Sequence, residues 1–501
     1  MRKKKLFHNT ISSITYQIIA IICGFILPKL ILTYYSSDVN GLVNSISEFL
    51  RFIAILDLGV GAVVCSSLYK PLANKDEEQI NKIMTSANKY FKTIGYILIV
   101  YIIVLPFIFY FFITNKFSFI YTLTLIISIS ISYLAQYLFG IVNQQLINAD
   151  QKGYIQYNLQ SITLILNTVL CSVLIINNAS IQIVKLTTSL VFLLRPIFLQ
   201  LYVRKNYNIN KKCKYKEEPI KQKWNGLFQH LTAVVLDSTD TIVLSIFSTL
   251  SNVSVYSVYF LVIHAVRQLI QSITNGLQSL LGNIIANEEK ENLTITFSLT
   301  EWSIHTISTF AFGCVMVMIV PFVKIYTSGI NDANYVVPTF GILITLAHLF
   351  FCYRLPYHLI IKASGKYKET QNNYLIAMIL NIVISIVLVQ KYGLIGVAIG
   401  TLVAMLYQTI GIAFYCSKNV VNWPLKKVFK QLLVDSIVII MGFYISRLII
   451  TDANNYISFI IQCIKVSVIF IIISSSMSFL LYRDNIKIVL NKIKVKKWNG
   501  D

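Results

Sequence analysis

Residues 97–114 read ILIVYIIVLPFIFYFFIT, an uninterrupted apolar run without a charged side chain. A helix of this length covers about 27 Å at 1.5 Å per residue, close to the roughly 30 Å of bilayer hydrocarbon. In lipid, only a helix or a closed barrel satisfies the backbone, and a barrel strand would alternate apolar and polar residues over about ten positions. The run does not alternate, so it predicts a transmembrane helix.

The rest of the chain has the same character. Of its 501 residues, 56% are hydrophobic and 13% are charged, against roughly 25% charged in ordinary soluble domains. This composition excludes a disordered chain, a fibrous repeat and a soluble enzyme. The expected fold class is an all-α polytopic membrane protein. We predict fourteen spans, at 11–34, 42–65, 93–114, 118–140, 154–177, 180–203, 226–250, 253–285, 298–324, 336–361, 371–390, 393–417, 431–450 and 456–482.

The net charge of +22 follows from loop topology. If Met1 is cytoplasmic, 32 of the 43 Lys and Arg residues lie on the cytoplasmic side of these spans, and only Lys116, Lys324 and Lys391 lie near the external side. This is the positive-inside pattern of membrane proteins. It places both termini in the cytoplasm and explains the basic charge by topology and anionic lipid contact, without nucleic acid.

The predicted domain organisation is two six-helix lobes and a C-terminal extension. Segment 204–225 is basic and poor in apolar residues, so we interpret it as a cytoplasmic linker. It separates an N-terminal lobe (1–203) from a C-terminal lobe (226–417). Two extra helices and a basic tail follow (418–501).

An internal repeat supports the two lobes. At an offset of 214 residues, 147–174 aligns with 361–388 with 11 identities in 28 positions, including Asn167 with Asn381. Both copies begin in a cytoplasmic loop and run outward, so the repeat is parallel. A parallel repeat implies a pseudo-two-fold axis along the membrane normal, with the substrate site expected in the cleft between the lobes.

Charged side chains at membrane depth are the functional candidates, because each costs about 2.5–3.5 kcal/mol on insertion scales. Arg51 and Arg267 are 216 residues apart, close to the repeat offset, so each lobe carries an arginine at similar depth. Arginines in a wet cleft bind phosphate in bidentate fashion. The candidate anion ligands are Arg51, Arg267, Arg354, Lys29 and Arg195. The candidates for ion coupling, or for neutralising these cations, are Glu48, Asp57, Asp237, Asp240 and His264.

Other charged residues are expected to be structural. Four lie near span ends, where we expect them to snorkel toward water: Arg447, Asp435, Lys185 and Glu301. His305 and Lys465 are expected to be structural within their spans. The eight cysteines are scattered and the six histidines form no cluster with them, so we predict no metal site and no cofactor.

Several motifs resemble the Wzx-type polysaccharide flippases of the multidrug/oligosaccharidyl-lipid/polysaccharide (MOP) exporter superfamily. The resemblance spans about residues 8–420. It is carried by Gly41-Leu-Val-Asn-Ser-Ile-Ser-Glu-Phe-Leu, Asp57-Leu-Gly-Val-Gly, Leu68-Tyr-Lys-Pro-Leu, Asp240-Thr-Ile-Val-Leu-Ser, Tyr256-Ser-Val-Tyr, Gly282-Asn, Leu380-Asn-Ile-Val-Ile-Ser and Tyr392-Gly-Leu-Ile-Gly-Val-Ala-Ile-Gly-Thr.

The resemblance implies two lobes that alternate between inward- and outward-open forms. It also implies the substrate, an undecaprenyl-diphosphate-linked oligosaccharide turned to the outer leaflet of the bacterial plasma membrane for polysaccharide biosynthesis. Related lipid II flippases have essential arginines, and their second-helix Leu-Arg-x-Ile pattern resembles Leu50-Arg51-Phe52-Ile53 here. Their eighth-helix arginine corresponds to Arg267, whereas their arginine-rich first helix is represented only by Lys29, which argues against lipid II itself.

The partners of a flippase and three alternative functions also have to be considered. The partners of a flippase would be the lipid-linked glycan, membrane lipids, a coupling proton or sodium ion, and other polysaccharide-assembly proteins. A cation-coupled multidrug exporter of the same superfamily is the first alternative, although basic residues are at least as frequent as acidic ones inside the spans. A polysaccharide polymerase or ligase is the second, and the short external loops argue against such an enzyme. A scaffold that transports nothing is the third.

Overall fold

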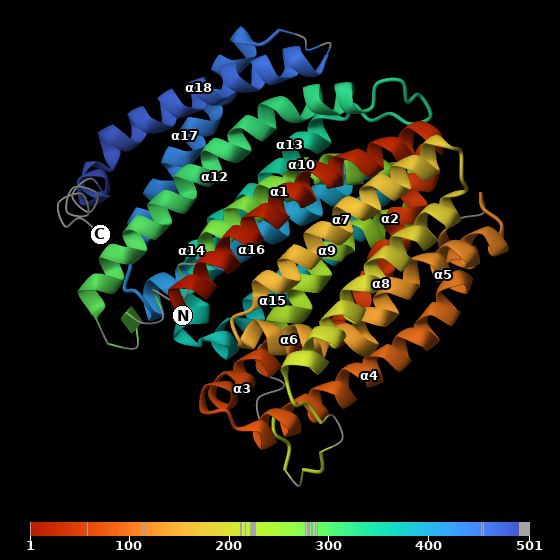
Figure 1. Cartoon of the computed structure of the whole chain (residues 1–501). Coiled ribbons are helices and arrows are strands. Elements are labelled where there is room, and N and C mark those ends of the chain that lie inside the picture. Colours follow the sequence, from red (N-terminus) through yellow and green to blue (C-terminus); the bar gives the residue numbers. More distant parts are fainter. Residues whose placement is uncertain are drawn as a thin grey trace. The chain divides into compact units, whose positions relative to one another are not determined.

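The computed structural model describes residues 2–57, 59–113, 116–210, 213–215, 217–220, 227–275, 277, 281, 284, 285, 287, 289–451, 453 and 455–489. All regular secondary structure among these residues is helical (Figure 1). Fourteen helical segments are long and apolar enough to cross a membrane. The predicted fold class, a polytopic all-α membrane protein with fourteen spans, is therefore confirmed.

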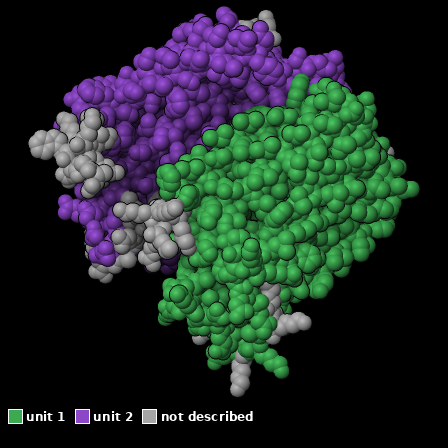
Figure 2. Space-filling view, viewed as in Figure 1, with its two compact units in different colours: residues 1–257 green, residues 258–501 purple. Residues whose placement is uncertain are grey.

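The chain forms two compact units, Met1–Ser257 and Val258–Asp501, which Figure 2 colours separately. The helix α10 begins in unit 1 and continues in unit 2. The division into lobes at segment 204–225 stays a prediction. The helices of unit 1 are α1 (Arg2–Tyr34), α2 (Ser37–Phe52), η1 (Ile53–Asp57), α3 (Val60–Asn74), α4 (Glu77–Ile108), η2 (Phe109–Ile113), α5 (Phe119–Ala135), η3 (Gln136–Gly140), α6 (Ile141–Ala149), α7 (Gly153–Ile176), α8 (Ile181–Asn206), α9 (Leu227–Phe247) and the start of α10 (Leu250–Asn275).

In unit 2, the long helix α12 contacts α13, α17 and α18, and α15 packs along α16 (Figure 1). The two predicted C-terminal helices are therefore present as α17 and α18, both packed on α12. The helices of this unit after α10 are α12 (Lys290–Tyr326), α13 (Pro338–Tyr353), α14 (Leu355–Ser364), α15 (Tyr367–Tyr392), α16 (Leu394–Asn419), α17 (Leu425–Ile449) and α18 (Tyr456–Leu481).

The second predicted span, 42–65, is wrong as a single helix. α2 and η1 end at Asp57, and a new helix, α3, begins at Val60. Gly59 between them has a φ of 73°, a left-handed conformation that glycine adopts without the steric cost of a Cβ atom. The segment between the second and third predicted spans, 66–92, is also largely helical, because α3 and the first turns of α4 occupy it.

The tenth predicted span, 336–361, is divided at Arg354. α13 ends at Tyr353 and α14 begins at Leu355. Pro356 has no backbone N–H to donate to the preceding turn, which accounts for the interruption. This bend puts Arg354 at the junction of two helical segments.

The motif glycines are packing positions. A Cβ atom on Gly400 would lie 2.2 Å from the Ser385 hydroxyl of α15, and one on Gly396 would lie 2.4 Å from the Leu388 carbonyl. A Cβ atom on Gly41 of α2 would lie 1.9 Å from the Leu250 carbonyl of α10. Small residues let membrane helices approach closely, so these motifs encode helix contacts. The Gly282-Asn motif lies outside the described residues.

Candidate functional site

Two of the predicted site residues, Glu48 and Arg51, lie side by side on one face of α2. The Arg51 guanidinium lies 3.0 Å from the Glu48 carboxylate. It also donates to the Asp237 backbone carbonyl at 3.2 Å and to the Ser238 hydroxyl at 3.3 Å, both on α9. The two side chains are partly accessible, at 40% and 23%. Arg51 is thus a cation with its counter-ion in place, bound to the backbone of a neighbouring helix.

Two other acidic candidates of unit 1, Asp57 and Asp240, make hydrogen bonds that hold helices, while Asp237 accepts from Arg51 through its backbone carbonyl. The Asp57 carboxylate accepts from the Gly61 backbone N–H at 3.3 Å, in the first turn of α3. Asp240 of α9 is 2% exposed, and its carboxylate accepts from the Tyr256 hydroxyl of α10 at 3.1 Å. Asp57 thus caps a helix after the Gly59 break, and Asp240 joins two helices.

The predicted arginines of unit 2 lie against one aromatic ring. The guanidinium carbons of Arg267 (α10) and Arg354 are 4.6 Å and 4.7 Å from the centroid of Phe351 (α13). Both arginines are buried. The predicted residue His264 lies one helical turn before Arg267 and contacts Phe260, whose ring also contacts His348. This arginine pair, Arg267 and Arg354, concentrates positive charge around one ring.

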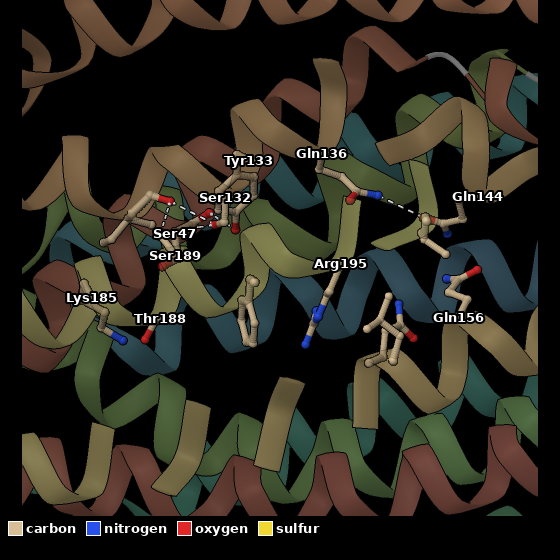
Figure 3. Close-up of a pocket in the computed structure, with 15 residues that line it drawn as sticks. Ser47, Ser132, Tyr133, Gln136, Gln144, Gln156, Lys185, Thr188, Ser189 and Arg195 are labelled. Carbon is tan, nitrogen blue, oxygen red and sulfur yellow. Dashed lines mark hydrogen bonds between the residues drawn. The ribbon is translucent and has the colours of Figure 1, made fainter. Parts of the chain in front are cut away.

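A polar cavity of about 330 Å³ lies inside unit 1 (Figure 3). Figure 3 shows Lys185 at one end, Gln144 and Gln156 at the other, and Arg195 between them. Its wall combines amides, hydroxyls, two cations and a few apolar side chains. The lining residues are Ser47, Ile129, Ser132, Tyr133, Gln136, Gln144, Gln156, Leu159, Gln160, Lys185, Thr188, Ser189, Phe192, Arg195 and Leu199.

The two cations of this cavity have no carboxylate beside them. The lining contains no Asp or Glu, and no ion pair to Lys185 or Arg195 occurs in the part of the chain that the structure describes. Arg195 donates from Nε to the Thr163 hydroxyl at 2.7 Å, and its guanidinium lies 3.9 Å from the Phe192 ring centroid. One edge of the guanidinium is therefore fixed by protein contacts that leave its charge uncompensated.

Lys29 does not line this cavity. It lies on α1 next to Pro28, half-buried, and its backbone carbonyl accepts from the Thr33 hydroxyl at 2.9 Å. Within unit 1, the predicted cationic residues thus occupy separate places: Arg51 on α2, Arg195 in the cavity and Lys29 on α1.

Two residues expected to snorkel are buried. Glu301 and Asp435 are each 3% exposed. Asp435 of α17 lies 2.7 Å from the His305 ring of α12, and its second oxygen accepts from the Gln431 amide at 3.0 Å. Glu301 accepts a hydrogen bond from the Tyr357 hydroxyl. The expectation fails because depth along a helix does not say which face a side chain occupies, and both face neighbouring helices.

Sequence reasoning missed the cavity, placing Lys185 with the snorkelling residues. The signal was present on α8: Thr188, Ser189, Phe192 and Arg195 follow Lys185 by three, four, seven and ten residues, which puts all five on one helical face. A mostly polar stripe of that spacing inside an apolar span indicates a helical face that lines a water-accessible cavity. The amides that complete the wall come from other helices, and no local pattern joins them.

Comparison with solved structures identifies the fold of the chain. Lipid II flippase MurJ, in an inward closed conformation, matches with a TM-score of 0.69 and 18% identity, over 95% of this chain and 99% of that one. A multidrug resistance MATE family transporter of the MOP superfamily, inward-facing, matches with a TM-score of 0.62 and 13% identity, over 81% and 98%. A eukaryotic MATE transporter matches with a TM-score of 0.58 and 14% identity, over 86% and 98%.

No protein-family model matches the chain, and no curated protein matches it in sequence. The structural likeness establishes that the chain has the fold of MOP-superfamily transporters.

Proposed function

We propose that the protein is a transporter that flips an undecaprenyl-diphosphate-linked oligosaccharide from the cytoplasmic to the outer leaflet of a bacterial plasma membrane, by alternating access. The observation that carries the proposal is the arginine pair of unit 2, with both guanidinium groups buried against Phe351. Two guanidinium groups that both lie within 4.7 Å of one ring centroid can bind a single anionic ligand that bridges them. A diphosphate offers several tetrahedral phosphate oxygens, and the planar guanidinium group binds such oxygens in pairs.

The same distribution of charge argues against the multidrug alternative. A cavity for cationic drugs needs carboxylates or aromatic faces without nearby cations. The cavity of unit 1 is lined by Lys185 and Arg195 and by no carboxylate, and Asp240, at 2% exposure, is hydrogen-bonded to Tyr256. Arg51 contributes less to head-group binding than the arginine pair in this proposal, since a phosphate must first displace Glu48 from it.

The test is a reconstituted flipping assay. Purified protein in liposomes would be given a fluorescent undecaprenyl-diphosphate oligosaccharide, and the accessibility of its sugar to an external quencher would be followed. We expect Arg267→Gln and Arg354→Gln each to slow flipping at least about tenfold, the effect of losing a charged hydrogen bond. The matched control is Arg447→Gln, since Arg447 also lies against a phenylalanine, Phe443, but is exposed near the end of α17.

Three outcomes decide the matter. Flipping by the wild type, with selective loss in the arginine-pair variants, supports both the function and the site. Equal flipping by all variants overturns the assignment of the site. A wild type that moves no lipid-linked sugar but extrudes cationic dyes overturns the function in favour of the multidrug exporter.

A further inference from the structure

The cavity of unit 1 has the chemistry of a ligand site rather than of a packing defect. Its volume of about 330 Å³ is at the lower end of ligand pockets in proteins. Packing defects are lined by apolar side chains, whereas most of the side chains that line this cavity carry an amide, a hydroxyl or a cationic group. The wall is assembled from α2, α5, η3, α6, α7 and α8, so six helical segments of unit 1 build it.

The charges in the wall select an anion. Lys185 and Arg195 both line the cavity, and they lie about 15 Å apart along α8 at 1.5 Å per residue. The nearest carboxylate in sequence to a lining residue is Glu48, beside Ser47, and it is engaged with Arg51 at 3.0 Å. Cations at membrane depth are normally paired, so the missing negative charge here is one that a ligand supplies.

The neutral side chains select hydroxyl groups. Gln136, Gln144, Gln156 and Gln160 provide amides that both donate and accept, as sugar hydroxyls do. Gln136 donates to Gln144 at 3.0 Å, which orients that amide pair. The hydroxyls of Ser132, Thr188 and Ser189 and the rings of Tyr133 and Phe192 complete the wall. This wall is richer in polar side chains than the mostly apolar pockets of drug-sized ligands, as a strongly hydroxylated ligand requires.

We infer that this cavity binds a hydroxylated anion, the size of one or two sugar residues, with its acidic group at Arg195 or Lys185 and its hydroxyls on the glutamines. The inference rests on the proposed function, because it names part of the transported head group. Two sources carry this chemistry: an acidic sugar within the glycan, or the diphosphate with its first sugar.

The first experiment measures binding without transport. Purified protein in detergent is titrated with glucuronate, glucose and inorganic pyrophosphate, and ligand-dependent thermal stabilisation gives apparent Kd values. We expect at least one of the two anions to bind at least about tenfold more tightly than glucose, and Lys185→Met and Arg195→Met to remove that preference. Gln156→Leu should weaken glucuronate binding, whereas Gln182→Leu, an amide on α8 that does not line the cavity, should leave it unchanged.

The outcomes identify the source. Tighter binding of glucuronate than of pyrophosphate, lost in the cation variants, assigns the cavity to an acidic sugar. The reverse order, equally lost, assigns it to the diphosphate. Equal affinity for glucose and both anions, or anion binding that survives Lys185→Met and Arg195→Met, overturns the inference.

The second experiment separates this inference from the proposed function. Flipping of lipid-linked glycans with and without a uronic acid is compared in the wild type and in Arg195→Met. A wild type that flips neither lipid contradicts the proposed function, while the binding titration still decides the cavity. If the acidic sugar is the source, loss of flipping at least about tenfold larger for the acidic glycan supports it, and equal loss for both glycans contradicts it.

Discussion

Arg51 and Arg195 are arginines of the same unit, both at membrane depth, and their surroundings differ. Arg51 has the Glu48 carboxylate at 3.0 Å and two acceptors on α9. Arg195 has one hydroxyl, Thr163, and one ring, Phe192, and shares its cavity with a second cation, Lys185. The first is a compensated charge that joins two helices. The second is an uncompensated charge that a ligand would neutralise.

The comparison shows that a charge inside a membrane span indicates function only when its partners are known. A compensated pair resists removal of one member, because the other is left without its counter-ion. An uncompensated cation is already unfavourable, so its removal should cost activity and spare stability. The predictions below test this difference, beginning with the largest expected effect.

The His305–Asp435 contact is more deeply buried than the Glu48–Arg51 pair. Both residues are buried, and their side chains are 2.7 Å apart. His305→Ala should destabilise the protein by about 3 kcal/mol, since it leaves Asp435 buried without its partner. Thermal unfolding in detergent measures this. The double variant His305→Leu/Asp435→Leu should recover most of the loss, and a double variant as unstable as the single one would contradict the assignment.

Removing the uncompensated charge should have the opposite signature. Arg195→Met should slow flipping of the substrate at least about tenfold, because a charged hydrogen bond to the ligand is lost. Its thermal stability should equal or exceed that of the wild type, since no carboxylate is left unpartnered. A matched measurement on Lys391→Met, an exposed lysine that rests on Tyr392, should show neither change. Destabilisation of Arg195→Met would mean that the arginine holds the bundle together.

The compensated arginine should respond through stability. Arg51→Gln should cost about 1 kcal/mol, a modest value because the pair is partly accessible to solvent. The double variant Glu48→Gln/Arg51→Gln should be closer to the wild type than Arg51→Gln alone. Thermal unfolding of the wild type, Glu48→Gln, Arg51→Gln and the double variant gives the coupling directly, and additive losses would show that Glu48 and Arg51 act independently.

The smallest expected change in stability concerns a cluster outside the spans, formed by Lys152, Asp150 and Tyr207. Lys152 lies 2.7 Å from Asp150, and the Tyr207 hydroxyl donates to the same carboxylate at 2.6 Å. Burial works to lower the pKa of Lys152, but the hydrogen bond and charge of Asp150 raise it. Burial and Asp150 both raise the pKa of Tyr207.

The sign of the pH dependence follows from these shifts. Both groups hold their protons more tightly in the folded state, so their stabilisation is complete below about pH 10 and is lost as pH rises further. The thermal stability of the wild type should therefore fall more steeply above about pH 10 than that of Asp150→Asn. Parallel curves for the two proteins would contradict this account of the cluster.

Much of the fold could be predicted from sequence because lipid solvation acts on each segment by itself. Apolar runs such as 97–114 predict transmembrane helices, and the predicted count of fourteen spans is confirmed among the residues that the structure describes. The break at Gly59 could not be predicted from hydropathy, since apolar residues continue on both sides of a left-handed glycine.

The sites were less accessible to sequence reasoning. Glu48 and Arg51 are three residues apart, a spacing that places them on one face of α2, and they form an ion pair there. Spacing could not show that Asp435 contacts His305, or that Gln136, Gln144 and Gln156 line one cavity with Arg195, because these residues come from helices that are distant in sequence. The depth of a charged residue is a property of sequence, whereas its partner is a property of tertiary packing.

The most direct test compares the two arginine environments in one flipping assay. Liposomes carrying wild type, Lys185→Met/Arg195→Met or Glu48→Gln/Arg51→Gln would receive an undecaprenyl-diphosphate glycan that contains an acidic sugar. The account predicts that the wild type equilibrates the lipid, that the cavity variant is slowed at least about tenfold, and that the neutralised pair stays within about threefold of the wild type. Flipping by the cavity variant at the wild-type rate, or no flipping of this lipid by the wild type, would contradict it.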